Sequence, residues 1–285
     1  MSDIPEDIAT RLRAARGFIF DMDGTIALGD HGSGGHVALP GAIELLALLH
    51  ARAIPVRVFT NGSAKPPAAY AASLRRAGLG VADHEMMTPS TAAAAWFVKQ
   101  RMTRVRVLGN DGVCAPLLEA GIEVIGPCEP ASGVEAVYTG WYREFTFPDL
   151  EAACGDIWAG AQLTTASHVP FFATADGRAI GSSYAINAMI TAMTGKRPRI
   201  LGKPARAAFD VAVAGMGLPR TAAPRIAVFG DDPALEMRMA HSAGALAVGM
   251  TTGLQTRESF AAQPPRDRAD LVLDRLDAVI AVLGG

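Results

Sequence analysis

The stretch FIFDMDGT (residues 18–25) places two acidic residues, Asp21 and Asp23, directly after a short apolar run. The run GFIF (17–20) predicts a buried strand, and Gly24 behind the second acid predicts a sharp turn. A buried strand that ends in two neighbouring carboxylates is unusual for a purely structural element. The pair therefore indicates a reactive site.

Short apolar runs alternate with helix-like segments along the chain, and no internal repeat is present. This alternation is typical of an α/β fold with a parallel sheet, in which reactive groups collect at the carboxyl ends of the strands. Further strands are expected near residues 55–60, 104–109, 133–141, 162–167, 170–175, 225–230 and 245–250, and helices near 42–52, 66–78, 88–101, 114–121, 147–160, 183–195, 204–217 and 233–244.

Polar clusters follow three of the expected strands. Asp21 and Asp23 follow the first, Thr60-Asn61 ends the next, and Asp231-Asp232 comes after RIAVFG (225–230). Each cluster alone would be ordinary turn chemistry, because these residue types favour turns. Three clusters at the ends of three parallel strands instead predict one shared site at that edge of the sheet.

The segments FDMDGT, FTNGS, GKP and GDD occur in this order and resemble the four motifs of the haloacid dehalogenase superfamily, over roughly residues 17–255. The resemblance implies a Rossmann-like core and a carboxylate nucleophile. By position, Asp21 is the nucleophile that forms an aspartyl-phosphate, and Asp23 is the general acid and base. Two neighbouring carboxylates titrate as a coupled pair, which favours a proton on one of them. Gly24 lets the chain turn close to the phosphate.

The other motifs supply the expected phosphate and metal contacts. Thr60 would hold a phosphoryl oxygen, and Lys203 would neutralise the nucleophile and the phosphate as a point charge. The expected substrate-binding residues are Gly24, Asn61, Gly62, Lys203 and His168. Mg²⁺ is the expected cofactor, because it is a hard cation that holds carboxylate and phosphate oxygens together. Its expected ligands are Asp21, Asp23 through its backbone carbonyl, Asp231 and Asp232. Glu236 stands where related sequences carry Asp, which leaves its role open.

About 140 residues separate Thr60 from Lys203, far more than a single crossover needs. We therefore expect an inserted α/β domain, and its placement resembles the C2-type cap of class IIA of the superfamily. The expected cap spans residues 88–195, and the core comprises residues 1–87 and 196–285. Residues 166–170 read ASHVP where relatives carry an Asn-Pro-Asp type of turn. His168 is therefore a hypothetical substrate contact, with an ordinary turn as the alternative, and Phe171 or Phe172 could line the pocket.

The glycine-rich segment DHGSGGH (30–36) is longer than the usual link in relatives and could act as a flap over the site. Its two histidines, His31 and His36, are five residues apart and could bind a transition metal, but a solvated loop is the favoured interpretation. The arginines that flank Lys203, namely Arg197, Arg199 and Arg206, are interpreted as a solvated basic face.

The net charge of −2 gives no electrostatic reason to expect nucleic acid or an anionic membrane as a partner. The first 17 residues lack the apolar stretch of a signal peptide, and the three cysteines form no CxxC pair. We expect a cytoplasmic protein with reduced thiols. Relatives often form homodimers through the cap, although no interface signature is evident here.

The expected function is hydrolysis of a small phosphorylated metabolite by a magnesium-dependent phosphatase. Asp23 favours phosphoryl transfer over dehalogenation, because dehalogenases do not need an acid at that position. A phosphomutase stays open. The alternative from another class is a phosphate-binding or scaffold protein with little turnover. A signalling receiver is disfavoured by the spacing of the two acids and by the inserted domain.

Overall fold

The computed structural model describes residues 4–29, 35–174, 177–253 and 255–284. The contacts within the chain divide it into two compact units. The first unit comprises residues 1–60, 68–87 and 209–285, and the second comprises residues 61–67 and 88–208. The second unit thus takes in residues 61–67 and 196–208 beside the expected cap, and the expected domain boundaries stay a prediction.

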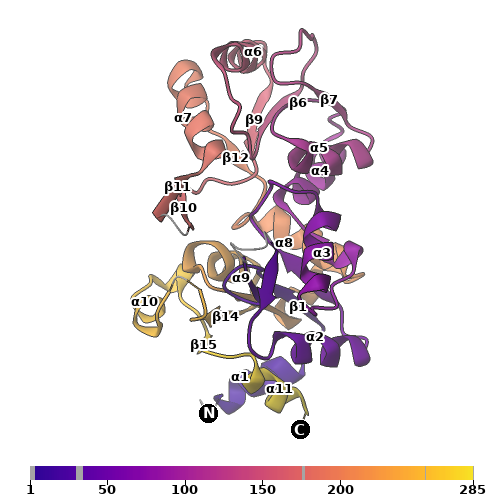
Figure 1. Cartoon of the computed structure of the whole chain (residues 1–285), viewed down its shortest axis with the longest axis vertical. Coiled ribbons are helices and arrows are strands. Elements are labelled where there is room, and N and C mark those ends of the chain that lie inside the picture. Colours follow the sequence, from indigo (N-terminus) through magenta and orange to yellow (C-terminus); the bar gives the residue numbers. More distant parts are fainter. Residues whose placement is uncertain (1–3, 30–34, 175–176, 254, 285) are drawn as a thin grey trace. The chain divides into compact units, whose positions relative to one another are not determined.

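The first unit is built on a six-stranded parallel sheet in the order β15-β14-β13-β1-β4-β5 (Figure 1). Its strands are β1 (Gly17–Phe20), β4 (Val56–Phe59), β5 (Met86–Met87), β13 (Ile226–Gly230), β14 (Leu246–Met250) and β15 (Leu271–Leu273). Its helices are α1 (Glu6–Arg13), α2 (Ala42–Ala51), α3 (Pro67–Arg76), α8 (Arg206–Gly215), α9 (Arg238–Ala243), α10 (Arg257–Ala261) and α11 (Asp277–Gly284). Shorter helical turns are η1 (Asp83–Glu85), η2 (Arg220–Arg225), η3 (Pro233–Met237) and η4 (Pro265–Asp267).

The central strand β1 is buried along its whole length, as expected for a parallel strand covered on both faces. Phe18 and Phe20 pack against Phe229 of β13, with ring centroids 6.0 and 4.9 Å apart. The register pairs Phe20 with Phe229, so both strands end at the same level. This packing fixes the height at which the residues after β1 and β13 emerge from the sheet.

The second unit has a five-stranded parallel sheet in the order β12-β9-β8-β6-β7 (Figure 1). Its strands are β6 (Arg104–Leu108), β7 (Glu123–Ile125), β8 (Ala136–Thr139), β9 (Gln162–Thr165) and β12 (Arg199–Ile200). Its helices are α4 (Pro89–Gln100), α5 (Asp111–Glu119), α6 (Phe147–Trp158) and α7 (Ser182–Thr194). Side chains of α4 and α5 pack into one apolar cluster and those of α6 and α7 into another. The α/β fold with parallel sheets expected from the sequence is thereby confirmed.

Each unit also carries an antiparallel hairpin, and of its strands the sequence predicted only the one near residues 170–175. In the first unit, β2 (Ala27–Gly29) pairs with β3 (His36–Ala38) directly after the FIFDMDGT stretch. In the second unit, β10 (Phe171–Thr174) pairs with β11 (Gly177–Ile180). Each strand has only three or four residues, too few to show a clear alternation of apolar and polar side chains.

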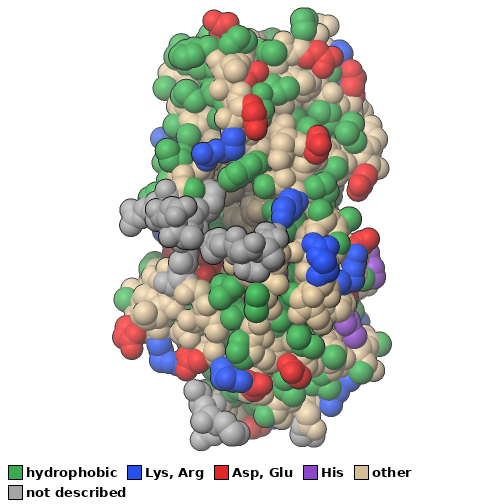
Figure 2. Space-filling view, in the orientation of Figure 1, with side chains coloured by type: hydrophobic (Ala, Val, Ile, Leu, Met, Phe, Trp, Pro, Cys, Tyr) green, Lys and Arg blue, Asp and Glu red, His purple; other side chains and the backbone are tan. Residues whose placement is uncertain are grey.

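On the face shown in Figure 2, acidic and basic side chains are scattered, and neither sign forms a continuous band. This distribution agrees with the small net charge of −2. Among the residues that the structure describes, no helix is both long and apolar enough to cross a membrane.

A partly buried ion pair connects α9 to the turn that precedes β15. Arg238 Nε and Nη2 donate to the two carboxylate oxygens of Asp267, each over 2.7 Å. The Asp267 side chain is only 5 % exposed, whereas that of Arg238 is 38 % exposed. The hydrogen bonds from Arg238 lower the pKa of Asp267. Because the folded pKa lies below the unfolded one, the pair stabilises the fold above the unfolded pKa and less so below it.

We predict that Asp267→Asn destabilises the fold by about 1–3 kcal/mol at neutral pH, because it leaves a charge-assisted pair incomplete. The extra stability of the wild-type protein should decrease as the pH falls from about 4, the unfolded pKa of Asp267, through its lower folded pKa. The unfolding free energies of the two proteins should therefore converge in this acidic range. Urea unfolding of both proteins at several pH values measures this. The exposed Asp83→Asn variant is the control, and a difference that persists unchanged into acid would contradict the assignment.

Candidate active site

The nucleophile expected from the sequence lies at the end of β1 in the first unit. Asp21 is 8 % exposed, and its backbone N–H donates to the carbonyl of Phe229 over 2.8 Å. This hydrogen bond extends the parallel pairing of β1 and β13 by one residue. The position of Asp21 is therefore fixed by the sheet itself rather than by a mobile loop.

Asp231, the first acid after β13, packs against the turn that follows Asp23. Gly24 has φ +78, and a β-carbon there would lie 2.5 Å from Asp231 Oδ2. A β-carbon at Gly253 would also collide with this carboxylate. Thr252 closes the turn from the same side, since its hydroxyl donates to the Gly24 carbonyl over 2.6 Å. Two glycines thus leave the space that the Asp231 carboxylate occupies beside the Asp23–Gly24 backbone.

Thr60 follows β4, the neighbour of β1 on its other side. Thr60 is 3 % exposed, and its backbone N–H donates to the Met87 carbonyl over 3.2 Å. The polar residues after β13, β1 and β4 therefore emerge side by side at one edge, because these three strands are adjacent and parallel.

Asp232 and Glu236 are engaged in shaping the turn after β13. Asp232 Oδ1 accepts a hydrogen bond from the Ala234 N–H over 2.8 Å, and Glu236 Oε2 accepts one from the Asp232 N–H over 3.0 Å. Glu236 is 2 % exposed, and a β-carbon at Gly230 would collide with its side chain. Glu236 thus holds the backbone of the residue that follows Asp231. The role of Asp232 as a metal ligand stays a prediction.

These residues fit a magnesium ion, although they do not form a closed cage. Among the described residues, no group of three or more His, Cys, Asp and Glu side chains is placed to hold a metal by itself. Magnesium, however, usually binds through one or two carboxylates and completes its shell with water and substrate phosphate. Asp21 and Asp231, together with the nearby carbonyl of Asp23, offer such a set of hard oxygen donors.

Asn61 and Lys203 are joined to each other in the second unit. The Lys203 N–H donates to Asn61 Oδ1 over 3.1 Å, and Asn61 Nδ2 donates to the Lys203 carbonyl over 3.5 Å. Lys203 is only 1 % exposed, and a lysine buried to this degree ordinarily faces negative charge. A side chain on Gly202 would collide with the Ala166 carbonyl, so the backbone at residue 202 can lie this close to Ala166 only as a glycine. The second and third motifs are therefore physically connected.

Two hydrogen bonds explain why the segment around Gly62 belongs with the inserted unit. The Trp141 N–H donates to Ser63 Oγ over 3.2 Å, and Asn110 Nδ2 donates to the Ala64 carbonyl over 2.9 Å. The structure thus carries Asn61, Gly62, Lys203 and His168 on the second unit. Asp21, Asp23, Gly24, Thr60, Asp231 and Asp232 lie on the first unit.

The ASHVP segment forms the connection between β9 and β10. Its Ser167 carbonyl accepts hydrogen bonds from the hydroxyls of Thr165 and Ser183, over 2.9 and 3.0 Å. His168 is exposed, and its ring lies 4.7 Å from that of Tyr184 on α7. Phe171 is 45 % exposed, whereas the side chain of Phe172 lies outside the described residues. Substrate contact by His168 stays a prediction.

The segment 30–36 is described only from Gly35 onward, so a flap role for residues 30–34 lies outside the described residues. The imidazole of His36 is 8 % exposed, contrary to the expectation of a solvated loop. Its Nδ1 lies 2.8 Å from Ser73 Oγ, and its Nε2 lies 3.9 Å from Asp23 Oδ1. Sequence reasoning missed this contact because Ser73 is 37 positions away.

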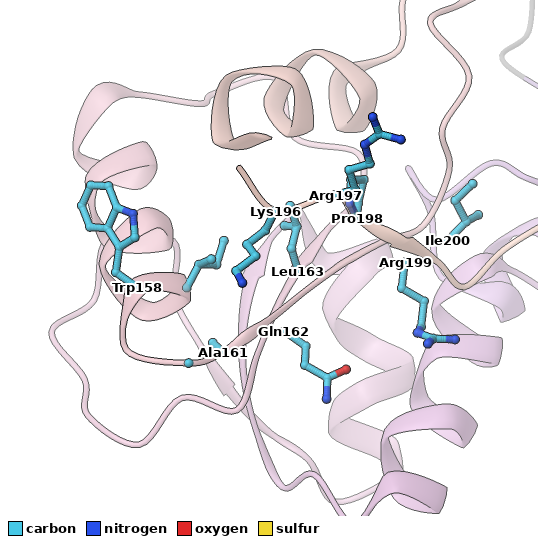
Figure 3. Close-up of a pocket in the computed structure, with 11 residues that line it drawn as sticks. Trp158, Ala161, Gln162, Leu163, Lys196, Arg197, Pro198, Arg199 and Ile200 are labelled. Carbon is cyan, nitrogen blue, oxygen red and sulfur yellow. The ribbon is translucent and has the colours of Figure 1, made fainter. Parts of the chain in front are cut away.

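A hollow of about 900 Å³ lies elsewhere in the second unit, between the end of α6 and residues 196–200 (Figure 3). None of the expected site residues line it. Figure 3 shows Arg197 and Arg199 pointing to opposite sides of the chain, and Arg199 lies 5.6 Å from the centre of the Trp96 ring. Arg197 and Arg199 are exposed, as expected for a solvated face, whereas Arg206 is half-buried.

Comparisons with known proteins find similar sequences and similar folds. A model of haloacid dehalogenase-like hydrolases matches residues 18–123, and a second model of related hydrolases matches residues 200–279. Human chronophin is 28 % identical over 92 % of this chain and 89 % of its own length. A 4-nitrophenylphosphatase from Thermotoga maritima is 26 % identical with a TM-score of 0.83, covering 96 % of this chain and 99 % of that structure.

A third likeness concerns the fold alone. The glycerol phosphate phosphatase of Mycobacterium tuberculosis, solved in complex with magnesium, is 23 % identical with a TM-score of 0.81. The match covers 94 % of this chain and 77 % of that structure.

We predict that Gly24→Ala lowers turnover of a phosphate ester at least about tenfold, because the added carbon displaces the Asp231 carboxylate and strains a positive φ at a cost of about 1–3 kcal/mol. Gly121→Ala is the matched control, since Gly121 has φ +77 with nothing within 4 Å of an added β-carbon. It should share the strain but keep its activity. Steady-state kinetics and thermal unfolding of both variants measure this, and equal activity in the two would refute the packing argument.

Proposed function

We propose that this chain, which belongs to the haloacid dehalogenase superfamily, is a magnesium-dependent phosphatase that hydrolyses a small phosphorylated metabolite through an aspartyl-phosphate. One observation carries the proposal: Asp21 at the end of β1 lies beside a turn against which the Asp231 carboxylate packs. The edge of the sheet therefore collects negative charge. This charge would attract a divalent cation, and the cation would in turn attract a phosphate. The full-length similarity to chronophin and to a 4-nitrophenylphosphatase supports the same class.

The first step is an in-line attack on phosphorus. A carboxylate oxygen of Asp21 forms a bond to phosphorus while the ester P–O bond breaks, and Asp23 gives a proton to the departing oxygen. In the second step, a water oxygen attacks phosphorus and Asp23 takes the water proton. Asp21 then departs as a free carboxylate, so the chain returns to its starting state with one ester hydrolysed.

Phosphate binding is assigned to residues of the second and third sequence motifs. Thr60, Asn61 and Gly62 would donate hydrogen bonds to phosphoryl oxygens, and the Lys203 ammonium would offset their charge. Asp21, Asp231 and the Asp23 carbonyl would hold Mg²⁺, which would reduce the repulsion between an anionic nucleophile and an anionic ester. The solved magnesium complex of a protein with the same fold supports the choice of metal.

Positioning and charge neutralisation should supply most of the rate, as is general for phosphoryl transfer. The buried backbone hydrogen bond of Asp21 and the reciprocal bonds between Asn61 and Lys203 both serve positioning. The named substrate of the Thermotoga relative supports a small phosphate monoester as substrate. His168 as a substrate contact and a homodimer remain part of the proposal. The first rests on the exposed position of His168 in the segment where this chain departs from its relatives, and the second rests on the dimers that relatives often form.

We predict Mg²⁺-dependent release of phosphate from 4-nitrophenyl phosphate and from at least one member of a panel of sugar phosphates, pyridoxal phosphate, phosphoglycolate and nucleotides. Asp21→Asn should reduce turnover at least about 10³-fold, because an amide cannot act as the nucleophile. Asp83→Asn, which changes an exposed carboxylate of the same unit, should leave turnover unchanged.

Phosphate release assayed with Mg²⁺ and with EDTA decides this. A folded wild-type protein that binds Mg²⁺ and phosphate but turns over no ester in the panel would favour the phosphate-binding alternative. Residual full activity of Asp21→Asn would exclude the proposed nucleophile.

A further inference from the structure

The hairpin β2–β3 grows directly out of the catalytic turn. The Gly24 N–H donates to the Ala27 carbonyl over 2.9 Å, and the Ala27 N–H donates to the Met22 carbonyl over 3.0 Å. The antiparallel register then sets His36 opposite Gly29. Because each step is a backbone contact, the pairing of residues 22–29 with residues 36–38 determines the position of His36 relative to Asp23.

The His36 ring is held from its other side by α3. Its Nδ1 lies 2.8 Å from Ser73 Oγ, and Ser73 is 1 % exposed. The His36 side chain is itself only 8 % exposed. A buried ring with one nitrogen engaged cannot turn freely, so the other nitrogen, Nε2, keeps its direction. That nitrogen lies 3.9 Å from Asp23 Oδ1.

Asp23 is more exposed than the proposed nucleophile. Its side chain is 56 % exposed, whereas Asp21 as a residue is 8 % exposed. A general acid must come within hydrogen-bond reach of the leaving oxygen, and a contact with a held side chain favours one direction of its carboxyl group. A separation of 3.9 Å exceeds a hydrogen bond, but catalytic hydrogen bonds are often long without substrate and shorten in the complex.

The direction of the proton also matters for an acid. When the Ser73 hydroxyl donates to Nδ1 of His36, the hydrogen of the neutral ring resides on Nε2. Nε2–H then donates to one oxygen of the Asp23 carboxyl group. The transferable proton is consequently carried by the other oxygen, which is available to the leaving group.

We propose that His36, held by Ser73, is a positioning residue that orients the Asp23 carboxyl group for proton delivery to the leaving oxygen. The inference rests on the proposed function and adds two residues that none of the four sequence motifs contain. His36 itself touches neither substrate nor metal in this account. It acts through Asp23 alone.

Two classes of substrate, aryl and alkyl phosphates, distinguish a role of His36 in proton delivery from a purely structural role. 4-Nitrophenolate is a stable anion and departs without a proton, whereas an alkoxide from an alkyl phosphate needs one. The ratio kcat/KM covers only the steps up to the first irreversible one, here the formation of the aspartyl-phosphate. A defect in proton delivery therefore lowers kcat/KM for the alkyl ester selectively, whereas a distorted site lowers both values alike.

The experiment compares wild-type protein with His36→Phe, which keeps a ring but removes both nitrogens. We expect kcat/KM for the best alkyl phosphate of the panel to fall about 30-fold, and that for 4-nitrophenyl phosphate to stay within about threefold, since general acid catalysis contributes about 10²–10⁴ in rate. The Asp23→Asn variant, which lacks the acid itself, should show the largest difference between the losses of kcat/KM on the two substrates. His36→Gln, which retains an amide donor, should recover part of the alkyl activity.

The Ser73→Ala variant tests the same positioning role with a smaller change. It removes only the hydroxyl that holds the ring, so it should lower the alkyl ester value selectively by a factor of about 3–10, as expected for the loss of one hydrogen bond. This variant keeps the test decisive if thermal unfolding shows that His36→Phe does not fold. Equal losses on both substrates, or no loss with Ser73→Ala, would overturn the positioning role.

Failure of the proposed function looks different. In that case wild-type protein would release phosphate from neither ester, or Asp21→Asn would retain the wild-type rate. Wild-type turnover that depends on Asp21 but shows no selective defect in the His36 and Ser73 variants would reject this inference alone.

Discussion

The parallel pairing of β1 with β13 is the constraint on which the rest of the site depends. It ends both strands at the same level, with Phe20 beside Phe229, and so brings the acids that follow them to one edge of the sheet. Carboxylates gathered in this way repel one another unless a cation or a proton intervenes. The fold thus creates a local excess of negative charge, which the proposed mechanism uses to hold a divalent metal.

The close packing of this edge explains features that otherwise have no common cause. Gly24, Gly230 and Gly253 each leave space that an acidic side chain fills, Asp231 in two cases and Glu236 in the third. Glu236 reaches the Asp232 N–H, which a shorter aspartate on the same backbone would reach less readily. The change from Asp to Glu at this position is therefore compatible with an intact site. The glutamate stabilises the turn that presents Asp231.

The sequence was sufficient to predict the parallel α/β fold and the strand-end residues, because both depend on local patterns within a few residues. It could not reveal the contact of His36 with Ser73 and Asp23, since that contact depends on a short hairpin meeting a distant helix. It also did not show that residues 61–67 associate with the inserted unit, which follows from hydrogen bonds to Trp141 and Asn110. Tertiary contacts of this kind leave no periodic signal in the sequence.

The measurement that tests the central claim most directly is the identification of the phosphorylated residue. The wild-type protein would be mixed with a substrate and Mg²⁺, quenched in acid within the first turnover and digested, and the peptide containing residues 18–25 analysed by mass spectrometry. The account predicts a phosphoryl group on Asp21 that forms only with Mg²⁺ and is lost on exposure to hydroxylamine. A turning-over enzyme with no acid-trapped phosphoryl group on this peptide, or with the group on another residue, would contradict it.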